Sequence, residues 1–292
     1  MRSLRAAALS FFVLLPLHAA DPFKTGTNDE VIAHIDQMVK NKTRDKTALA
    51  SMAALLQDPN ASVGVRERVA WAMGQLDMRS DVNKLISAAK DKGLLVRSAA
   101  LNALIRMRAR SAYPVFLDIA KNDPVLSLRQ RAVLGMGLLR WEKAVNDLAE
   151  LSSDERSEVR AAAALAMAAT HSKKNNFTQI LNEMKSDPDA FVQARAQAGL
   201  ELAQGKRDLV AARLEDTDAD VRLFAAQYYH YQGTQADLKR VKDAANGESD
   251  EYVRLELVDA GRSIEKRIAA QKKAAAKKAA AAKAAEKKEK TQ

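Results

Sequence analysis

Few side chains in this 292-residue sequence could perform acid–base, nucleophilic or metal chemistry. It contains no cysteine, which excludes thiol nucleophiles, thiolate zinc sites and disulfides. Beyond the N-terminal segment the histidines are His34, His171 and His230, which lie far apart and belong to no His-Glu pair of the kind that binds catalytic metals. The sequence therefore offers no recognisable catalytic set, no cofactor-binding motif and no metal site, and we expect a protein that is not an enzyme.

Two short stretches imitate ligand-binding motifs but lack residues that those motifs require. Residues 216–220 (Asp-Thr-Asp-Ala-Asp) resemble the start of a calcium loop, yet Val221 stands where the loop needs glycine and Gln227 where it needs glutamate. The pair Gly135 and Gly137 lacks the glycine and lysine that complete a phosphate-binding loop. We interpret the first stretch as a turn with helix caps and the second as a site of close helix packing.

The net charge of +10 is confined to the two ends of the chain. Residues 1–20 carry +2 and residues 262–292 carry +8, so residues 21–261 are neutral overall. A neutral body argues against a nucleic-acid-binding domain and assigns any attraction for polyanions to the C-terminal segment.

The N-terminus has the pattern of a signal peptide. A basic stretch, Met1 to Arg5, precedes an apolar stretch, Ala6 to Leu17, and Ala19 and Ala20 are small enough for cleavage. The apolar stretch is shorter than the roughly 20 residues that span a bilayer. We expect residues 1–20 to direct export, most simply to a bacterial periplasm, and no transmembrane segment to remain after cleavage.

The rest of the chain is built on a repeat. An apolar residue followed by arginine recurs every 29 to 33 residues, and one copy has glutamine instead of arginine. The seven copies are Val65-Arg66, Val96-Arg97, Leu128-Arg129, Val159-Arg160, Val192-Gln193, Val221-Arg222 and Val253-Arg254. Glycine and proline are scarce, with 11 and 6 residues, which favours helices over a many-turned β-protein.

Other positions keep the same register. An acidic residue stands six residues before the arginine or glutamine in every copy but the first, and a small residue stands six residues after it in every copy but the sixth, which has Tyr228. In the third copy, Asn122-Asp123-Pro124 separates two helical stretches. Each repeat therefore reads as two helices, and the small residues mark where neighbouring helices approach closely. A phenol in this column predicts a local change of packing at the sixth repeat.

The pattern Asp-Pro-x-x-x-Leu-Arg-x-x-Ala, as in Asp123 to Ala132, resembles HEAT repeats, particularly the short bacterial kind also found in phycobilisome lyases. The resemblance covers about residues 46–262. It implies an all-α protein, an α-solenoid (superhelix) of about seven helix pairs, whose second helices line a concave, partner-binding surface. It also implies a structural ladder between acids and arginines, here Asp91 with Arg97, Asp123 with Arg129, Asp154 with Arg160, and Asp216 with Arg222. Because Gln193 departs from the pattern, Asp187 is expected to have a weaker partner.

The two ends of the array differ from the repeats. Residues 21–45 contain apolar positions at helical spacing, including Val31, Ile35 and Met38, and are expected to form an N-terminal capping helix. Residues 263–292 form a Lys/Ala-rich tail without an apolar face, for which we expect a single exposed helix followed by disorder.

Two groups of residues are candidates for partner binding. Four arginines on the expected second helices, Arg68, Arg106, Arg108 and Arg131, would form a basic strip for an acidic peptide, unless they are solvated or pair with acids of the chain. Tyr229 and Tyr231 belong to an unusual tyrosine cluster, for which a packing irregularity is the alternative.

Three classes of function remain open on the sequence. The favoured one is an exported, monomeric, non-enzymatic scaffold that binds a protein or acidic peptide along its concave face. The second is binding of a polyanion, such as a cell-wall polymer, acidic lipid or nucleic acid, by the basic tail. The third is an enzyme or chromophore-handling protein similar to the bilin lyases or the HEAT-like DNA glycosylases, which the absence of a catalytic set disfavours.

Overall fold

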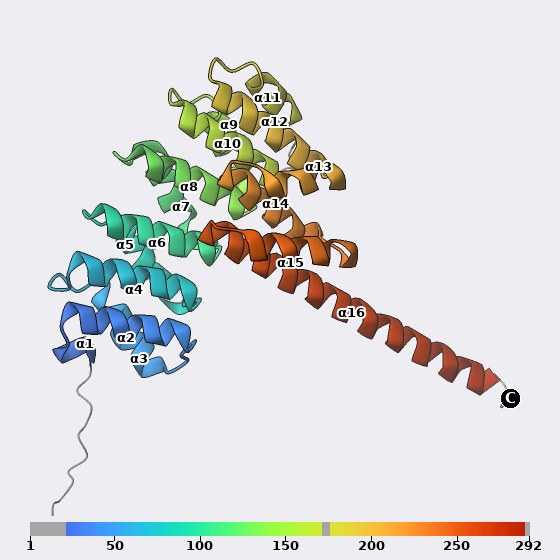
Figure 1. The fold of residues 1–292 in the computed structure, drawn as a ribbon, viewed down its shortest axis with the longest axis horizontal. Coiled ribbons are helices and arrows are strands. Elements are labelled where there is room, and N and C mark those ends of the chain that lie inside the picture. Colours follow the sequence, from blue (N-terminus) through green and yellow to red (C-terminus); the bar gives the residue numbers. More distant parts are fainter. Residues whose placement is uncertain (1–21, 171–175, 290–292) are drawn as a thin grey trace, which may run out of the picture. The chain divides into compact units, whose positions relative to one another are not determined.

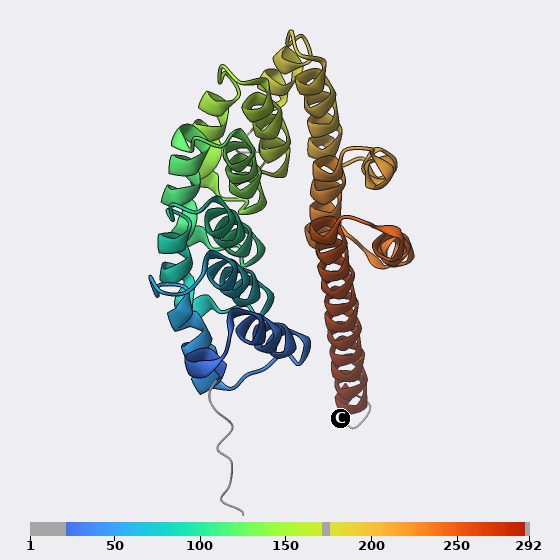
Figure 2. The ribbon, with the colours of Figure 1, turned by 60° about the vertical axis from the view of Figure 1, so that its left-hand side comes forward.

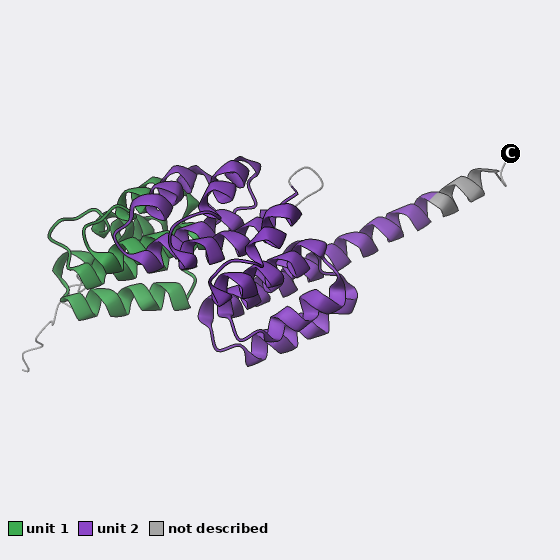
Figure 3. Cartoon of the chain, turned by 90° about the horizontal axis from the view of Figure 1, so that it is seen from above, with its two compact units in different colours: residues 1–107 green, residues 108–292 purple. Residues whose placement is uncertain are grey.

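The computed structural model describes residues 22–170 and 176–289, and within these ranges the regular structure is entirely helical (Figure 1). Residues 1–20, for which a signal peptide is predicted, and His171 lie outside the described residues. The chain divides into two compact units, residues 1–107 and residues 108–292 (Figure 3). Both units are stacks of antiparallel helix pairs, so the protein is an all-α solenoid.

The first unit contains a capping helix and two helix pairs. Its helices are α1 (Pro22–Thr25), α2 (Asn28–Lys40), α3 (Lys46–Leu55), α4 (Val63–Gln75), α5 (Val82–Ala88) and α6 (Leu94–Arg106). The capping helix α2 begins with a capping box in which Thr27 and Glu30 satisfy each other's backbone N–H groups. It buries Val31 and Ile35 and packs against α4.

The second unit contains five helix pairs. Its helices are α7 (Tyr113–Asn122), α8 (Leu126–Leu138), α9 (Val145–Leu151), α10 (Ser157–Thr170), α11 (Thr178–Met184), α12 (Ala190–Gln204), α13 (Arg207–Ala212), α14 (Ala219–Gln232), α15 (Leu238–Gly247) and α16 (Glu251–Glu289). Together the two units hold the seven pairs expected from the repeat. Figure 2 shows α13 and α15 on one side of the column that α12, α14 and α16 form.

Small residues allow the second helices to approach closely within each unit. A Cβ atom placed on Gly74 of α4 would lie 2.8 Å from the Cα atom of Ala103 on α6. One placed on Gly137 of α8 would lie 2.4 Å from the Cα atom of Ala166 on α10. Real Cβ atoms do not approach other carbons this closely, so these glycines are required by helix packing and not by a ligand loop.

The helix α10 has no polar face after its first turn, and the fold covers it on every side. Residues 161–170 are all buried. Its sequence there is mostly alanine, and it packs against α8, α9, α12 and α14. A helix that is apolar on all sides must be covered on all sides. The contact with α14 covers the side of α10 that α8, α9 and α12 leave open.

The stacking changes at the sixth repeat. The helices α8, α10 and α12 pack side by side along their lengths, as do α14 and α16, but α12 and α14 touch over only a short stretch. At that joint the Tyr228 hydroxyl donates a hydrogen bond to the Gly205 carbonyl (2.9 Å), and its ring packs against Gly205. In the other repeats this position holds alanine or glycine, and the neighbouring helix fills the space beside it. The phenol of Tyr228 occupies that space at the sixth repeat, so α12 and α14 lie farther apart.

The last helix, α16, continues far beyond the final repeat. Its first part packs against α14 and α15, whereas residues 269–281 are exposed (Figure 1). The Lys/Ala-rich tail is therefore a single helix to Glu289. Among the described helices, none combines the length and apolar character needed to cross a membrane.

Candidate functional site

The repeat arginines fasten the turn of each repeat to the second helix that follows it. In four repeats the guanidinium donates a hydrogen bond to the backbone carbonyl of the acidic residue six positions earlier. These bonds join Arg97 to Asp91 (3.0 Å), Arg129 to Asp123, Arg160 to Asp154 (2.8 Å) and Arg222 to Asp216 (2.7 Å). The pairs named from the sequence are thus brought together, but through the backbone of the acidic residue and not through its carboxylate.

Three of the acidic side chains pair with the arginine of the preceding repeat, whereas the Asp154 carboxylate pairs with Arg156 of its own turn (3.0 Å). Arg160 donates two hydrogen bonds to Asp187 (2.8 and 2.9 Å), Arg222 donates two to Glu248 (2.8 and 2.9 Å), and Arg66 donates one to Asp91. These hydrogen bonds lower the pKa of Asp187 and of Glu248 below their ordinary values. Arg66, Arg160 and Arg222 therefore each link two successive repeats.

The expectation that Asp187 has a weak partner is corrected by this register. Asp187 is held by Arg160, and Gln193 donates its own hydrogen bond to the Asp187 carbonyl (2.7 Å). The acid that lacks a repeat arginine from the preceding repeat is instead Asp216, because Gln193 stands where that arginine would be. Asp216 pairs with Arg213 (2.6 Å). A sequence column alone does not say whether an arginine reaches backward or forward along the stack.

The residues that imitate a calcium loop bind an arginine instead. Arg195, with a side chain only 4% exposed, lies 2.7 Å from a carboxylate oxygen of Asp218 and 2.6 Å from one of Asp220. Among the described residues no group of three or more histidine or acidic side chains could hold a metal ion. The three acids therefore neutralise arginines and cap α14, where Asp218 accepts a hydrogen bond from the Asp220 N–H.

In the first unit, the candidate arginines lie on an accessible face. Arg68 of α4 pairs with Asp36 of α2 (3.0 Å) and stacks on the Trp71 ring, with its guanidinium carbon 4.6 Å from the ring centroid. Its side chain is 37% exposed. Arg106 is half-exposed in the last turn of α6.

In the second unit, the candidate arginines pair with acids of the chain, which is the alternative to a partner-binding basic strip that the sequence left open. Arg108 lies 2.7 Å from Glu256, and Arg131 lies 3.9 Å from Asp220 and stacks on Tyr252. Both acids come from the last two repeats. The superhelix of this unit therefore fills its own inner face, and the arginines lie inside the contact.

The two candidate tyrosines have opposite environments. Tyr229 is fully buried, so the expectation that it contacts a partner is corrected. Tyr231 is 37% exposed, and the guanidinium carbons of Arg140 and Arg108 lie 4.6 and 5.5 Å from its ring centroid. Two positions along a helix turn a side chain by about 200°, so Tyr229 and Tyr231 of α14 face different surroundings.

Sequence reasoning missed Glu256, the acid at the centre of this contact. Its side chain is 14% exposed and lies 2.7 Å from Arg108 and 3.2 Å from Nδ1 of His230. Burial opposes its ionisation, but the hydrogen bond with His230 and the charge of Arg108 outweigh burial and hold the pKa of Glu256 below its ordinary value. Arg108 is 148 residues away in sequence, so no local pattern marks the pair.

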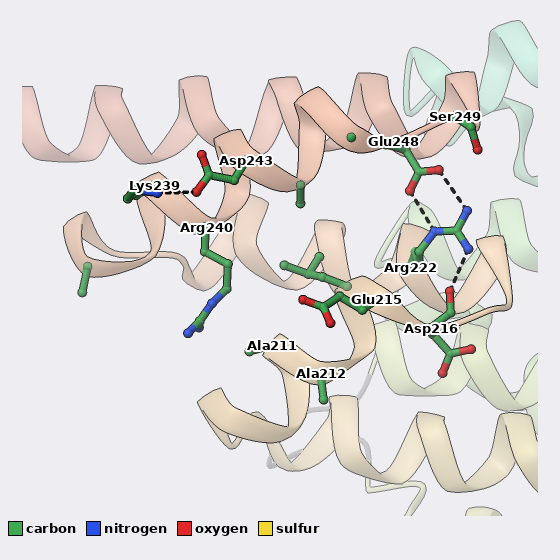
Figure 4. A pocket seen from close by; sticks show the side chains of 14 residues that line it. Ala211, Ala212, Glu215, Asp216, Arg222, Lys239, Arg240, Asp243, Glu248 and Ser249 are labelled. Carbon is green, nitrogen blue, oxygen red and sulfur yellow. Dashed lines mark hydrogen bonds and ion pairs between the residues drawn. The ribbon is translucent and has the colours of Figure 1, made fainter.

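Several hollows open in the described part of the second unit, and two of them are considered in turn. The larger, of about 1060 Å³, lies between α13 and α15, and the Arg222–Glu248 pair lies at one end of it (Figure 4). Lys239 and Asp243 pair with each other at its edge (2.6 Å). The smaller hollow, of about 290 Å³, lies where α12 and α14 separate and includes Arg140, Gln227 and Tyr228 in its lining.

Comparisons with known proteins agree with this architecture. The family model for HEAT repeats matches residues 49–137 and 113–201. A structure of the complex of CpcE and CpcF of phycocyanin lyase from Nostoc sp. PCC7120 is 15% identical, with 90% of this chain and 100% of that chain covered and a TM-score of 0.50. A comparison with curated proteins finds no match.

Two further solved structures are less similar. The designed armadillo repeat protein YIII(Dq)4CqI is 17% identical, with 62% of this chain and 96% of that chain covered and a TM-score of 0.40. Human deoxyhypusine hydroxylase is also 17% identical, with 80% and 97% covered and a TM-score of 0.34. At such identities the likeness to solved structures concerns the fold alone.

Proposed function

This chain belongs to the HEAT-repeat family, and we propose that it is an exported, non-enzymatic scaffold that binds a protein or peptide partner. We place the binding surface on the second-helix face of the first unit, where α4 and α6 lie side by side. Export is supported by the signal-peptide pattern of residues 1–20. N-terminal sequencing of the protein recovered from the periplasm tests it, and a chain that keeps Met1 contradicts it.

One observation carries the choice of surface. The position five residues after the repeat arginine holds half-exposed Trp71 and Asn102 in the first unit. In the second unit the same position holds Leu134 and Leu165, which are 2% and 0% exposed. The inner face of the second unit is thus filled by the chain itself, whereas that of the first unit presents an aromatic ring and polar groups.

The chemistry of this open face suits a protein partner. Tryptophan and arginine are enriched among the residues that dominate binding energy at interfaces. Arg68 is already oriented by Asp36 and by stacking on Trp71, so little side-chain entropy is lost when it binds a carboxylate or carbonyl. An acidic or carbonyl-rich segment laid across α4 and α6 would pair with Arg68 and Arg106 and cover Trp71.

The test is affinity capture from cell-envelope extracts. The natural sequence is expected to recover a stoichiometric partner. The double variant Arg68→Ala/Trp71→Ala is expected to recover at least tenfold less of that partner. The matched control is Arg79→Ala, which removes an exposed arginine (62%) of the same unit. Equal capture by the double variant, with unchanged helical content, would contradict the proposed surface.

A second candidate function rests on the exposed part of α16. Residues 269–281 are exposed and include Lys272, Lys273, Lys277 and Lys278. Such a helix offers charge but no apolar face, and its affinity for a polyanion would fall steeply with salt. A chain ending at Ile268 keeps the packed Ile264 and Arg267 and should lose polyanion binding while it keeps the protein partner. Retention of polyanion binding by that shortened chain would contradict a role for the tail.

A further inference from the structure

Arg140 is a half-buried arginine that has no acidic partner among the described residues. It follows α8, and the charged or titratable groups that act on its guanidinium are Tyr231 and Arg108, with no carboxylate among them in the described part of the chain. Arg108, which stacks on the same tyrosine, has Glu256 at 2.7 Å. Two positive charges, on Arg140 and Arg108, and one negative charge, on Glu256, therefore lie around Tyr231.

The backbone at Arg140 is also unfavourable for arginine. Its φ is +47°, in the left-handed region that favours glycine. Glycine does occupy the equivalent place after α12, where Gly205 has φ +62°. An arginine at such a place costs backbone energy and, when half-buried and unpaired, desolvation energy as well. The backbone cost is shared by Lys42, Asp77 and Arg108, with φ of +49°, +52° and +49°, so the feature particular to Arg140 is its half-buried guanidinium without a described acidic partner.

The space beside Arg140 is the smaller hollow, of about 290 Å³. It is bounded by the last turns of α10, α12 and α14, and its polar groups come from Gln204, Gln227, Tyr228 and Gln232. The Gln227 amide already donates to the Leu138 carbonyl (3.0 Å), but the exposed amides of Gln204 and Gln232 stand at the rim with donors to offer. This volume suits a small ligand or the last residues of a peptide.

The guanidinium selects the chemistry of the ligand. One face of its plane is covered by the Tyr231 ring at 4.6 Å, which leaves the N–H groups at its edge. Five N–H donors in a planar fork match the two oxygens of a carboxylate. In the described part of the chain no carbonyl or carboxylate accepts a hydrogen bond from its side chain, so those donors remain available.

We propose that the hollow beside Arg140 binds a carboxylate, which pairs with the guanidinium while the amides of Gln204 and Gln232 contact the rest of the ligand. The carboxylate comes either from a small organic acid or from the C-terminus of a peptide. This site lies in the second unit and does not depend on the partner surface proposed for α4 and α6.

The test uses the full chain and titration calorimetry with three probes: propionate, a tripeptide with a free C-terminus, and the same tripeptide as its C-terminal amide. The decisive variant is Arg140→Gly. Glycine is at ease at this φ, so the variant should fold at least as well and yet bind the carboxylate at least tenfold more weakly. Lys42→Gly is the matched control, because Lys42 is an exposed basic residue with φ +49° after α2.

Each outcome decides the proposal. Binding of propionate and of the free peptide, lost in Arg140→Gly and kept in Lys42→Gly, supports it with a small acid as a sufficient ligand. Binding of the free peptide alone supports it with a peptide C-terminus as the source. Binding of no carboxylate, equal binding of the amide, or unchanged binding by Arg140→Gly overturns it. Failure of the α4–α6 surface in capture leaves these results unaffected.

Discussion

The carboxylate of Asp187 accepts two hydrogen bonds, of 2.8 and 2.9 Å, from the guanidinium of Arg160, which stands 27 residues earlier in the chain. The two side chains are 10% and 15% exposed. The same guanidinium also donates to the Asp154 carbonyl, so one residue ties two turns to α10. The ladder is therefore a set of shared arginines rather than a set of separate pairs.

Arg160→Ala is expected to lower the free energy of unfolding by about 1–3 kcal/mol, because a mostly buried carboxylate and a carbonyl lose their donor. Thermal and urea unfolding of the purified variant measure the loss. Arg79→Ala removes an exposed pair with Asp77 and should cost less than about 1 kcal/mol. If the two variants melt at the same temperature, Arg160 has no structural role of this kind.

Gly137→Ala is expected to destabilise the protein by about 1–3 kcal/mol, because the added methyl group would overlap Ala166 and force α8 and α10 apart. Gly64→Ala in α4 is the control, since nothing lies within 4 Å of the added carbon. The control should gain up to about 1 kcal/mol from the lower helix propensity of glycine. Urea unfolding compares the two, and a stabilising effect at Gly137 would contradict the close packing.

Lys42→Gly is expected to stabilise the protein by about 0.5–1 kcal/mol. Lys42 is exposed and has φ +49°, a conformation that costs an L-residue energy and glycine almost none. Lys40→Gly is the matched control, because Lys40 is the last residue of α2 and glycine weakens a helix. Opposite shifts in urea midpoint are expected, and a loss of stability in Lys42→Gly would refute the strain.

The contacts of Glu256 with Arg108 and His230 should make the free energy of unfolding depend on pH in the acid range. Its folded pKa is held below the ordinary value of 4.5, so its contribution is complete above about pH 4.5 and is lost as pH falls through the folded pKa. Glu256→Gln should therefore reduce stability at neutral pH and flatten the decline below pH 4.5. Unfolding curves at a series of pH values measure this, and parallel declines in both proteins would remove Glu256 as a cause.

The helix pairs could be predicted from the sequence because their signals are local. The spacing of Val96-Arg97 to Leu128-Arg129 and the break at Asp123-Pro124 act within one repeat, where backbone hydrogen bonding and apolar burial determine helix position. The exposed C-terminal helix could be predicted for the same reason, since alanine and lysine favour a helix but provide no apolar face.

The contacts across the superhelix could not be predicted in this way. The closure of α14 over α10, the bond from Gln227 to the Leu138 carbonyl and the pairing of Arg108 with Glu256 join residues that are separated by several repeats. Such contacts depend on the small rotation between successive helix pairs, which accumulates along the stack and changes where Tyr228 separates α12 from α14. Sequence alone therefore determined what each repeat is, whereas the tertiary structure decided that Tyr229 is buried, that Arg108 is paired and that Arg140 is not.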